Sequence, residues 1–209
     1  MIKLYGVGFS RSFRTLWAAE EAGVEYEYIN VEFGSKEENG SLSEEYQRLN
    51  NQGKVPSLND DGFYLTESAA IINYLGNKST NEQLLPADGT KARAKYDEMC
   101  FFILSELEQG LWTDGKHRFA LPEEYRIPEI TTKSAHFEFA KAQKSLLGLK
   151  GNNTFAIGES FTLADVLLAH TISWAERFEF EVAPELIAYR DKMIKRPAFQ
   201  RAAAKIPKN

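Results

Sequence analysis

Three short stretches of the sequence carry residue types that could bind or activate a small polar ligand. The first is Ser10-Arg11-Ser12, where two hydroxyls and a guanidinium follow an apolar run and precede a segment of helical periodicity. Side chains and backbone amides at the start of such a helix converge on whatever lies above that end of the sheet. The hydroxyls could donate hydrogen bonds to an anion, and plain capping of the helix is the alternative use.

A proline marks the second stretch, which reads Lys54-Val55-Pro56. A proline before a strand gives up a ladder hydrogen bond unless its peptide bond is cis or the strand lies at an edge. A cis bond would turn the Val55 backbone outward, where its amide and carbonyl could pair with an extended peptide ligand. An ordinary edge-strand proline is the alternative, and the residues alone leave both open.

The third stretch is Glu67-Ser68, which stands directly before the apolar residues Ala69 to Ile72. This order places a carboxylate, a hydroxyl and backbone amides at the start of a predicted helix, where anions bind readily. Capping of the helix explains the same pair by itself. Glu67 and Ser68 therefore become candidate binding residues only in combination with the other two stretches.

The sequence offers no thiol or metal chemistry of its own. Its one cysteine, Cys100, excludes an intrachain disulfide and a CxxC motif, and its three histidines lack metal-ligand spacing. The default for Cys100 is a buried, inert thiol. We expect no metal site, and any thiol that reacts would come from a ligand.

Composition places the chain among ordinary globular proteins. The 209 residues are 43% hydrophobic and 26% charged, with a formal net charge of −5 and no basic run. A nucleic-acid binder needs a basic patch, so we expect no nucleic-acid partner. No stretch approaches the roughly 18 consecutive apolar residues of a membrane span, and the first residues do not read as a signal peptide. We therefore expect a cytoplasmic protein with no membrane association.

The elements that would position the three stretches alternate in the first part of the chain. Ile2 to Tyr5 is typical of a buried strand, Phe13 to Ala22 has helical periodicity, and Val24 to Phe33 alternates as a strand does. A polar segment with a short helix follows, and then a strand, an Asp-Gly turn, a strand and a helix from Ser68 to Leu75. The order βαβ, then ββα, predicts a small mixed sheet of the thioredoxin-like kind.

Helical spacing without strand alternation fills the rest of the chain. We predict an α/β domain at residues 1–78, a linker at 79–90 and an all-helical bundle at 91–209. Thr162 and Asp165 are spaced as a capping box, which we interpret as structural. The helices expected in the bundle are Ala92 to Trp112, Thr132 to Leu149, Leu163 to Glu176 and Pro184 to Lys195.

In this order and spacing, the pieces resemble the cytosolic glutathione S-transferase family across nearly the whole chain, and its serine-type, bacterial-like members in particular. The resemblance implies the glutathione transferase fold, with a thioredoxin-like domain that binds glutathione and an all-α domain that supplies the pocket for the second substrate. It also implies a homodimer. The residues that carry it are Tyr5-Gly6, Ser10 to Arg14, Gly53 to Pro56, Glu67 to Ile71 and Thr162 to Asp165.

The resemblance further implies roles for individual residues. Pro56 matches the cis-proline of the family, and Val55 matches the residue that pairs with the cysteinyl backbone of glutathione. Glu67 and Ser68 match the clamp on the γ-glutamyl group. The whole set implied for glutathione is Gln52 or Lys54 at the glycyl carboxylate, together with Val55, Pro56, Glu67 and Ser68.

The catalytic position matches Ser10 when it is counted from the first strand and Ser12 when it is counted back from the helix, with Arg11 beside both. We favour Ser10. By resemblance, its hydroxyl would donate a hydrogen bond to the glutathione sulfur, stabilising the thiolate for attack on a small hydrophobic electrophile in detoxification. Peroxide reduction, reductive dehalogenation and isomerisation through glutathione are variants that the sequence does not separate.

A noncatalytic binding or assembly module with the same fold is the alternative function, because the residues that hold glutathione would look the same. A damaged Ser10 region beside an intact Pro56 and Glu67 would favour that alternative. All three are present. The sequence therefore favours an enzyme.

Overall fold

The computed structural model describes residues 1–207, apart from the side chain of Thr132. The chain divides into two compact units, of which the first holds Met1–Leu85 and the segment that begins at Ile194. The second holds Pro86–Met193. An α/β unit and an all-helical unit are the two parts of the predicted fold class, which is confirmed.

The first unit is built on a four-stranded mixed sheet with the order β2-β1-β3-β4. Its strands are β1 (Ile2–Gly6), β2 (Tyr26–Asn30), β3 (Ser57–Asp60) and β4 (Phe63–Thr66). β2 runs parallel to β1, whereas β3 is antiparallel to both β1 and β4. The βαβ and ββα halves predicted from the sequence are therefore both present, joined through the pairing of β1 with β3.

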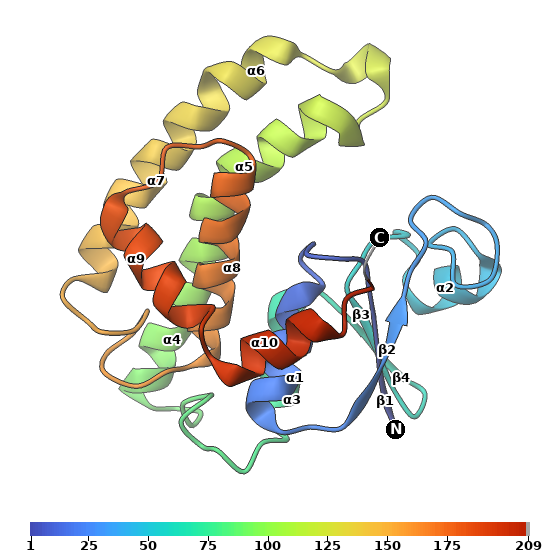
Figure 1. Cartoon of the computed structure of the whole chain (residues 1–209), viewed down its shortest axis with the longest axis horizontal. Helices are drawn as coiled ribbons and strands as arrows, with labels where there is room; N and C mark the ends of the chain where they lie inside the picture. Colours follow the sequence, from blue (N-terminus) through green and yellow to red (C-terminus); the bar gives the residue numbers. More distant parts are fainter. Residues whose placement is uncertain (208–209) are drawn as a thin grey trace. The chain divides into compact units, whose positions relative to one another are not determined.

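Three helices accompany the sheet: α1 (Phe13–Ala22), α2 (Glu44–Leu49) and α3 (Ser68–Gly76). In Figure 1, α1 and α3 lie on one side of the strands and α2 lies on the other. The core lies between the sheet and the α1/α3 pair, because the side chains buried there come from all three. They include Leu4 and Leu58 from the strands, Leu16 and Trp17 from α1, and Ile71, Ile72 and Leu75 from α3.

The predicted turn between β3 and β4 is present, whereas the predicted length of β2 is wrong. The Asp-Gly turn is confirmed, because Asp61 and Gly62 connect β3 to β4 with φ of 48° and 94°, the positive values that a tight hairpin needs at both positions. The strand predicted from Val24 to Phe33 is shorter in the structure. β2 ends at Asn30, because its partner strand β1 ends at Gly6, the residue opposite Asn30.

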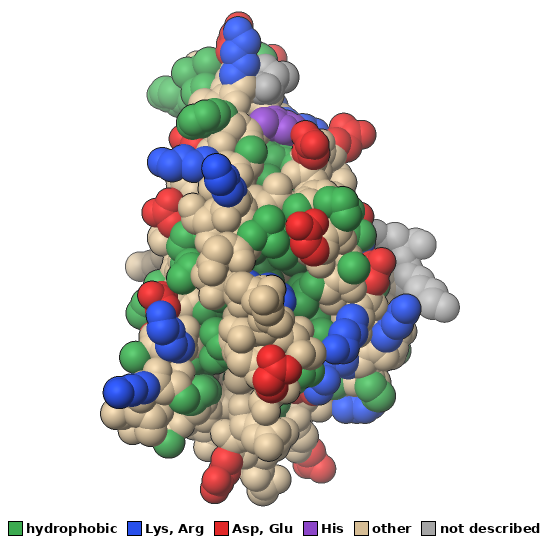
Figure 2. All heavy atoms as spheres, turned by 90° about the vertical axis from the view of Figure 1, so that its left-hand side faces the viewer, with side chains coloured by type: hydrophobic (Ala, Val, Ile, Leu, Met, Phe, Trp, Pro, Cys, Tyr) green, Lys and Arg blue, Asp and Glu red, His purple; other side chains and the backbone are tan. Residues whose placement is uncertain are grey.

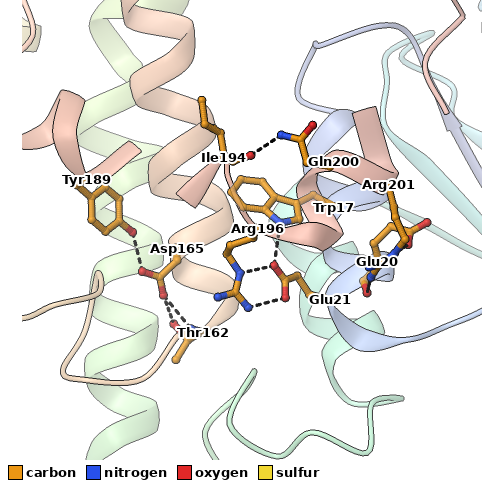
Figure 3. A network of polar contacts seen from close by, with 10 residues as sticks. All are labelled: Trp17, Glu20, Glu21, Thr162, Asp165, Tyr189, Ile194, Arg196, Gln200 and Arg201. Carbon is orange, nitrogen blue, oxygen red and sulfur yellow. Dashed lines mark hydrogen bonds and ion pairs between the residues drawn. The ribbon is translucent and has the colours of Figure 1, made fainter. Parts of the chain in front are cut away.

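The C-terminal segment packs on α1 (Figures 1 and 3). Its helix α10 (Pro197–Ala204) places the ring of Phe199 5.0 Å from that of Trp17. Arg196 donates two hydrogen bonds to Glu21, of 2.6 and 2.8 Å, and Glu21 also accepts one of 3.0 Å from the Trp17 indole. The predicted boundaries place this segment in the helical domain, whereas the structure groups it with the α/β unit through these contacts.

The second unit is helical throughout its regular structure, and the four predicted helices are present with altered bounds. The one expected from Thr132 begins at Ser134, because the backbone of Lys133 departs from helical geometry at φ −119° and ψ −73°. A π-helical turn interrupts the first predicted helix at Ile103–Leu107. The elements are α4 (Lys91–Phe102), η1 (Ile103–Leu107), α5 (Glu108–Gly115), η2 (Lys116–Ala120), η3 (Glu123–Tyr125), α6 (Pro128–Thr132), α7 (Ser134–Lys150), α8 (Leu163–Arg177) and α9 (Pro184–Met193).

The capping box predicted at Thr162 and Asp165 begins α8 and is confirmed. The Asp165 carboxylate accepts a hydrogen bond of 2.8 Å from the Thr162 amide, another of 2.8 Å from the Ala156 amide, and one of 2.6 Å from the Tyr189 hydroxyl. Figure 3 shows the contacts with Thr162 and Tyr189. Asp165 is fully buried, so these donors replace the water it gives up on folding. Its role is therefore structural.

Acidic and basic side chains are interspersed on the face shown in Figure 2, with apolar side chains between them. That distribution agrees with the modest net charge of −5. Among the residues described, no helix is both long enough and apolar enough to cross a membrane.

Candidate active site

The pairing of the sheet brings the three candidate stretches to one edge. Tyr5 near the end of β1 stands opposite Ser57 at the start of β3, and Ser57 stands opposite Thr66 at the end of β4. The loop that follows β1, the loop that precedes β3 and the residue that follows β4 therefore leave the sheet side by side. These are the loops of Ser10, Pro56 and Glu67, so stretches up to 57 residues apart in the chain form one candidate site.

The two serines of the first loop lie in different surroundings. Ser12 is buried, with 1% of its surface exposed, whereas Ser10 and Arg11 are half-buried. The Ser12 hydroxyl accepts a hydrogen bond of 3.0 Å from the Val7 amide and lies 2.8 Å from the Ser10 hydroxyl. Ser12 thus ties the loop together from inside, while Ser10 stands nearer the surface.

Gly6 is what lets Ser12 come so close to the sheet. A Cβ atom added at Gly6 would lie 2.5 Å from both Cβ and Oγ of Ser12, a separation that no relaxed structure tolerates. The end of β1 therefore needs a glycine, and the serine loop folds over it. The buried position of Ser12 follows from this close approach.

The second stretch contains a cis peptide bond between Val55 and Pro56, so that alternative of the sequence analysis is confirmed. Val55 is half-buried and Pro56 is buried, whereas Lys54 and Gln52 are exposed. A groove of about 390 Å³ passes between the end of α2 and β4, and Gln52 and Thr66 are among its lining residues. Both candidates for the glycyl carboxylate therefore have side chains that a ligand could reach.

The third stretch combines backbone strain with a buried cation. Glu67 begins α3 at φ 67° and ψ 117°, in the positive-φ region that side-chain-bearing residues rarely adopt. Glu67 is exposed and Ser68 is buried. Behind them, the fully buried Arg14 of α1 donates a hydrogen bond of 3.3 Å from its guanidinium to the Ser68 hydroxyl. The loop of Ser10 and the start of α3 are therefore linked through α1.

Arg14 was not among the predicted site residues, although its place in the sequence indicates a special role. A charged residue stands in that helix between Phe13 and Leu16, on the stretch that the core covers. A buried arginine needs hydrogen-bond acceptors, and one that reaches Ser68 supplies positive charge at the start of α3. The hydrogen bond to Ser68 could not be predicted, because the two residues are 54 positions apart in the sequence.

Cys100 belongs to the helical unit and not to the unit that holds the candidate site. It lies in α4 of the second unit with 4% of its surface exposed, and burial raises the pKa of its thiol to about 12. Such a thiol stays protonated and unreactive near neutral pH. The prediction that Cys100 is buried is confirmed, and the raised pKa of its thiol agrees with an inert role.

Comparisons with known proteins agree with this geometry. Residues 1–77 match the family model for the glutathione S-transferase N-terminal domain, and residues 122–197 match the model for the C-terminal domain. The glutathione S-transferase GstA of Escherichia coli O157:H7 is 32% identical over 186 residues, which cover 87% of this chain and 87% of that protein. The maleylacetoacetate isomerase of Rattus norvegicus is 30% identical over 84% of this chain and 78% of its own length.

A solved structure extends the similarity from sequence to fold. A sphingomonad glutathione S-transferase complexed with glutathione has a TM-score of 0.83 and 25% sequence identity, with 97% of each chain covered. Sequence and structure thus match over both units. The chain therefore belongs to the glutathione S-transferase family and is a glutathione transferase.

Proposed function

We propose that this enzyme activates the glutathione thiol as a thiolate at Ser10 and transfers it to a small hydrophobic electrophile. The observation that carries the proposal is the meeting of the Ser10, Pro56 and Glu67 loops at one sheet edge. Val55 pairs with the cysteinyl backbone, Glu67 and Ser68 hold the γ-glutamyl group, and Gln52 or Lys54 meets the glycyl carboxylate.

The pKa of the glutathione thiol sets how much help the enzyme must give. A free thiol has a pKa of about 8.5, and lowering it to about 6.5 takes roughly 2.7 kcal/mol. A charge-assisted hydrogen bond from a hydroxyl contributes roughly 1.5 to 3 kcal/mol. One serine donor, helped by the nearby Arg11 and the start of α1, therefore suffices without a general base.

The hydrogen bonds of the first loop favour Ser10 over Ser12 as that donor. Ser12 accepts from the Val7 amide, so its own hydrogen is best placed on the Ser10 oxygen 2.8 Å away, because its alternative acceptor, the Val7 carbonyl, lies 3.4 Å away. In that arrangement Ser10 accepts from the Ser12 hydroxyl and also, at 3.3 Å, from the Ser12 amide, and Ser10 is the serine nearer the surface. Ser12 is then a positioning residue, and Ser10 is the group that meets the sulfur.

The partners follow from the same proposal. The electrophile is a small hydrophobic molecule, for which the helical unit, Pro86–Met193, supplies the pocket. The enzyme works as a cytoplasmic homodimer in detoxification. Glutathione-dependent isomerisation is a second candidate reaction, favoured by the similarity to the rat maleylacetoacetate isomerase.

The first experiment measures glutathione binding by calorimetry and then the ultraviolet absorbance of the bound thiolate across pH. We expect a thiolate pKa near 6.5 in the native enzyme, raised by about 2 units in Ser10→Ala. Ser12→Ala is the matched control, with a smaller rise. A thiolate pKa that is unchanged in Ser10→Ala would contradict the assignment of the catalytic serine.

Assays with an aryl halide and with a maleyl ketone separate the two candidate reactions. Conjugation of the aryl halide releases halide ion, whereas isomerisation leaves the glutathione concentration unchanged. A chain that binds glutathione and turns over neither substrate nor a peroxide would favour the noncatalytic module.

A further inference from the structure

The carbonyl of Lys54 is held by two buried side chains of the α2 region. The Tyr46 hydroxyl donates a hydrogen bond of 2.7 Å to this oxygen, and the Asn50 side-chain amide donates another of 2.8 Å. Tyr46 is 3% exposed and Asn50 is 6% exposed, so both bonds lie out of the solvent. Lys54 lies in an exposed loop, and these two hydrogen bonds hold its carbonyl in one direction, which the loop backbone alone would not do.

Ser57 closes this arrangement onto the sheet. Its hydroxyl accepts a hydrogen bond of 3.1 Å from the Asn50 amide and lies 3.1 Å from the Tyr46 hydroxyl. Every hydrogen then has a place, because Asn50 donates one to Lys54 and one to Ser57, Tyr46 donates to Lys54, and Ser57 donates to Tyr46. Burial raises the pKa of the Tyr46 hydroxyl, which keeps it protonated as a donor.

The geometry of the peptide group carries this constraint to the candidate site. The Lys54 carbonyl and the Val55 amide belong to one planar trans peptide, so the N–H points away from the oxygen that α2 holds. We infer that Tyr46, Asn50 and Ser57 form a positioning cluster that aims the Val55 amide at the cysteinyl carbonyl of bound glutathione. The inference rests on the proposed function, which makes Val55 the docking residue.

The cluster is separate from the thiolate machinery. Its members come from α2, the loop before β3 and β3 itself, whereas Ser10 and Ser12 belong to the loop between β1 and α1. Loosening the cluster should therefore weaken binding without changing the acidity of the bound thiol. A residue that acts only through general stability would not show this split.

Tyr46→Phe and Asn50→Asp test the cluster with little change in shape. The first removes one hydroxyl, and the second places a carboxylate against the Lys54 carbonyl. We expect each to raise the Kd for glutathione about 5- to 10-fold, as loss of a buried hydrogen bond to a binding group does. The pKa of the bound thiolate should stay within about 0.3 units of the native value.

Tyr74→Phe is the matched control. The Tyr74 hydroxyl also donates a hydrogen bond to β3, of 2.7 Å to the Asp60 carboxylate, but at the end of the strand that lies away from Ser57. This variant should bind glutathione within about twofold of the native enzyme. Hydrogen exchange of residues 50–55 should speed up in Tyr46→Phe and stay unchanged in Tyr74→Phe.

The outcomes distinguish the inference from the proposed function. Native binding that Tyr46→Phe and Asn50→Asp leave unchanged would overturn the positioning cluster while the proposed function stands. An equal loss in Tyr74→Phe would also overturn it. A native enzyme that binds no glutathione would overturn the proposed function itself, and the inference with it.

Discussion

The helices α1 and α2 both support the candidate site, and they do so by different physical means. Eight of the ten residues of α1 are buried, and the C-terminal segment covers it with the ring of Phe199 and with ion pairs from Arg196 and Arg201. In α2 only Tyr46 of six residues is buried. The serine end of the site is therefore carried by packing, whereas the Val55 end is carried by a few directed hydrogen bonds.

This difference separates two properties that substitutions often change together. Apolar burial contributes to the stability of the whole unit, because each side chain removed from water adds to the same cooperative core. Directed hydrogen bonds contribute little net stability but define the direction of one group. We therefore expect α1 substitutions to change stability first and α2 substitutions to change glutathione affinity first.

The largest expected effect is on the free energy of unfolding, when a leucine is replaced by alanine in α1 and in α2. Leu16→Ala in α1 removes a side chain that is 1% exposed, and we expect it to lower the free energy of unfolding by about 3 kcal/mol. Leu49→Ala in α2 removes a half-buried one, with an expected loss of about 1 kcal/mol. Urea denaturation followed by circular dichroism measures both, and equal losses would remove the distinction between the helices.

A smaller effect should come from the ion pairs between α1 and the C-terminal segment. Arg196→Ala leaves Glu21, whose side chain is 7% exposed, without its two-pronged partner, so we expect a loss of about 2 kcal/mol. Arg201→Ala breaks a pair in which the arginine is 56% exposed, and should cost less than about 1 kcal/mol. Thermal unfolding at low and moderate salt checks the order, and a larger loss in Arg201→Ala would reverse it.

The smallest expected effect is a difference in amide hydrogen exchange between α1 and α2 of the native enzyme. Backbone amides of α2 should exchange with deuterium through local opening, whereas those of α1 should exchange only as the unit unfolds. Saturating glutathione should slow exchange in residues 44–55 more than in α1. Mass spectrometry after timed labelling measures the difference, and matching rates in the two helices would show that α2 is as firmly held as α1.

Much of the fold could be predicted from the sequence, because its signals are local. The short apolar run of Ile2 to Tyr5, the helical period of Phe13 to Ala22 and the Asp61-Gly62 turn each depend on neighbouring residues alone. The bounds of β2 could not be predicted, since they depend on the length of its partner strand. The place of α10 was equally hidden, because it depends on pairs such as Arg196 and Glu21 that are 175 residues apart.

The candidate site shows the same limit at a finer scale. Ser10, Pro56 and Glu67 could be chosen because their types and order are diagnostic in combination. The different burial of Ser10 and Ser12 could not, because it follows from the close approach of Ser12 to Gly6 across the turn. The cluster around the Lys54 carbonyl joins Tyr46, Asn50 and Ser57 by hydrogen bonds whose geometry no residue pattern encodes.

The grouping of the C-terminal segment with the α/β unit also constrains how the protein is made. A ribosome completes Met1–Leu85 and then more than a hundred further residues before it adds Arg196. During that time Trp17 and Glu21 of α1 lack the contacts that the C-terminal segment later makes with them. The helical unit is, in topological terms, an insertion within the sequence of the α/β unit. Nascent chains halted before Ile194 should therefore expose the apolar surface of α1 to chaperones. Synthesis of the segment that begins at Ile194 completes the unit.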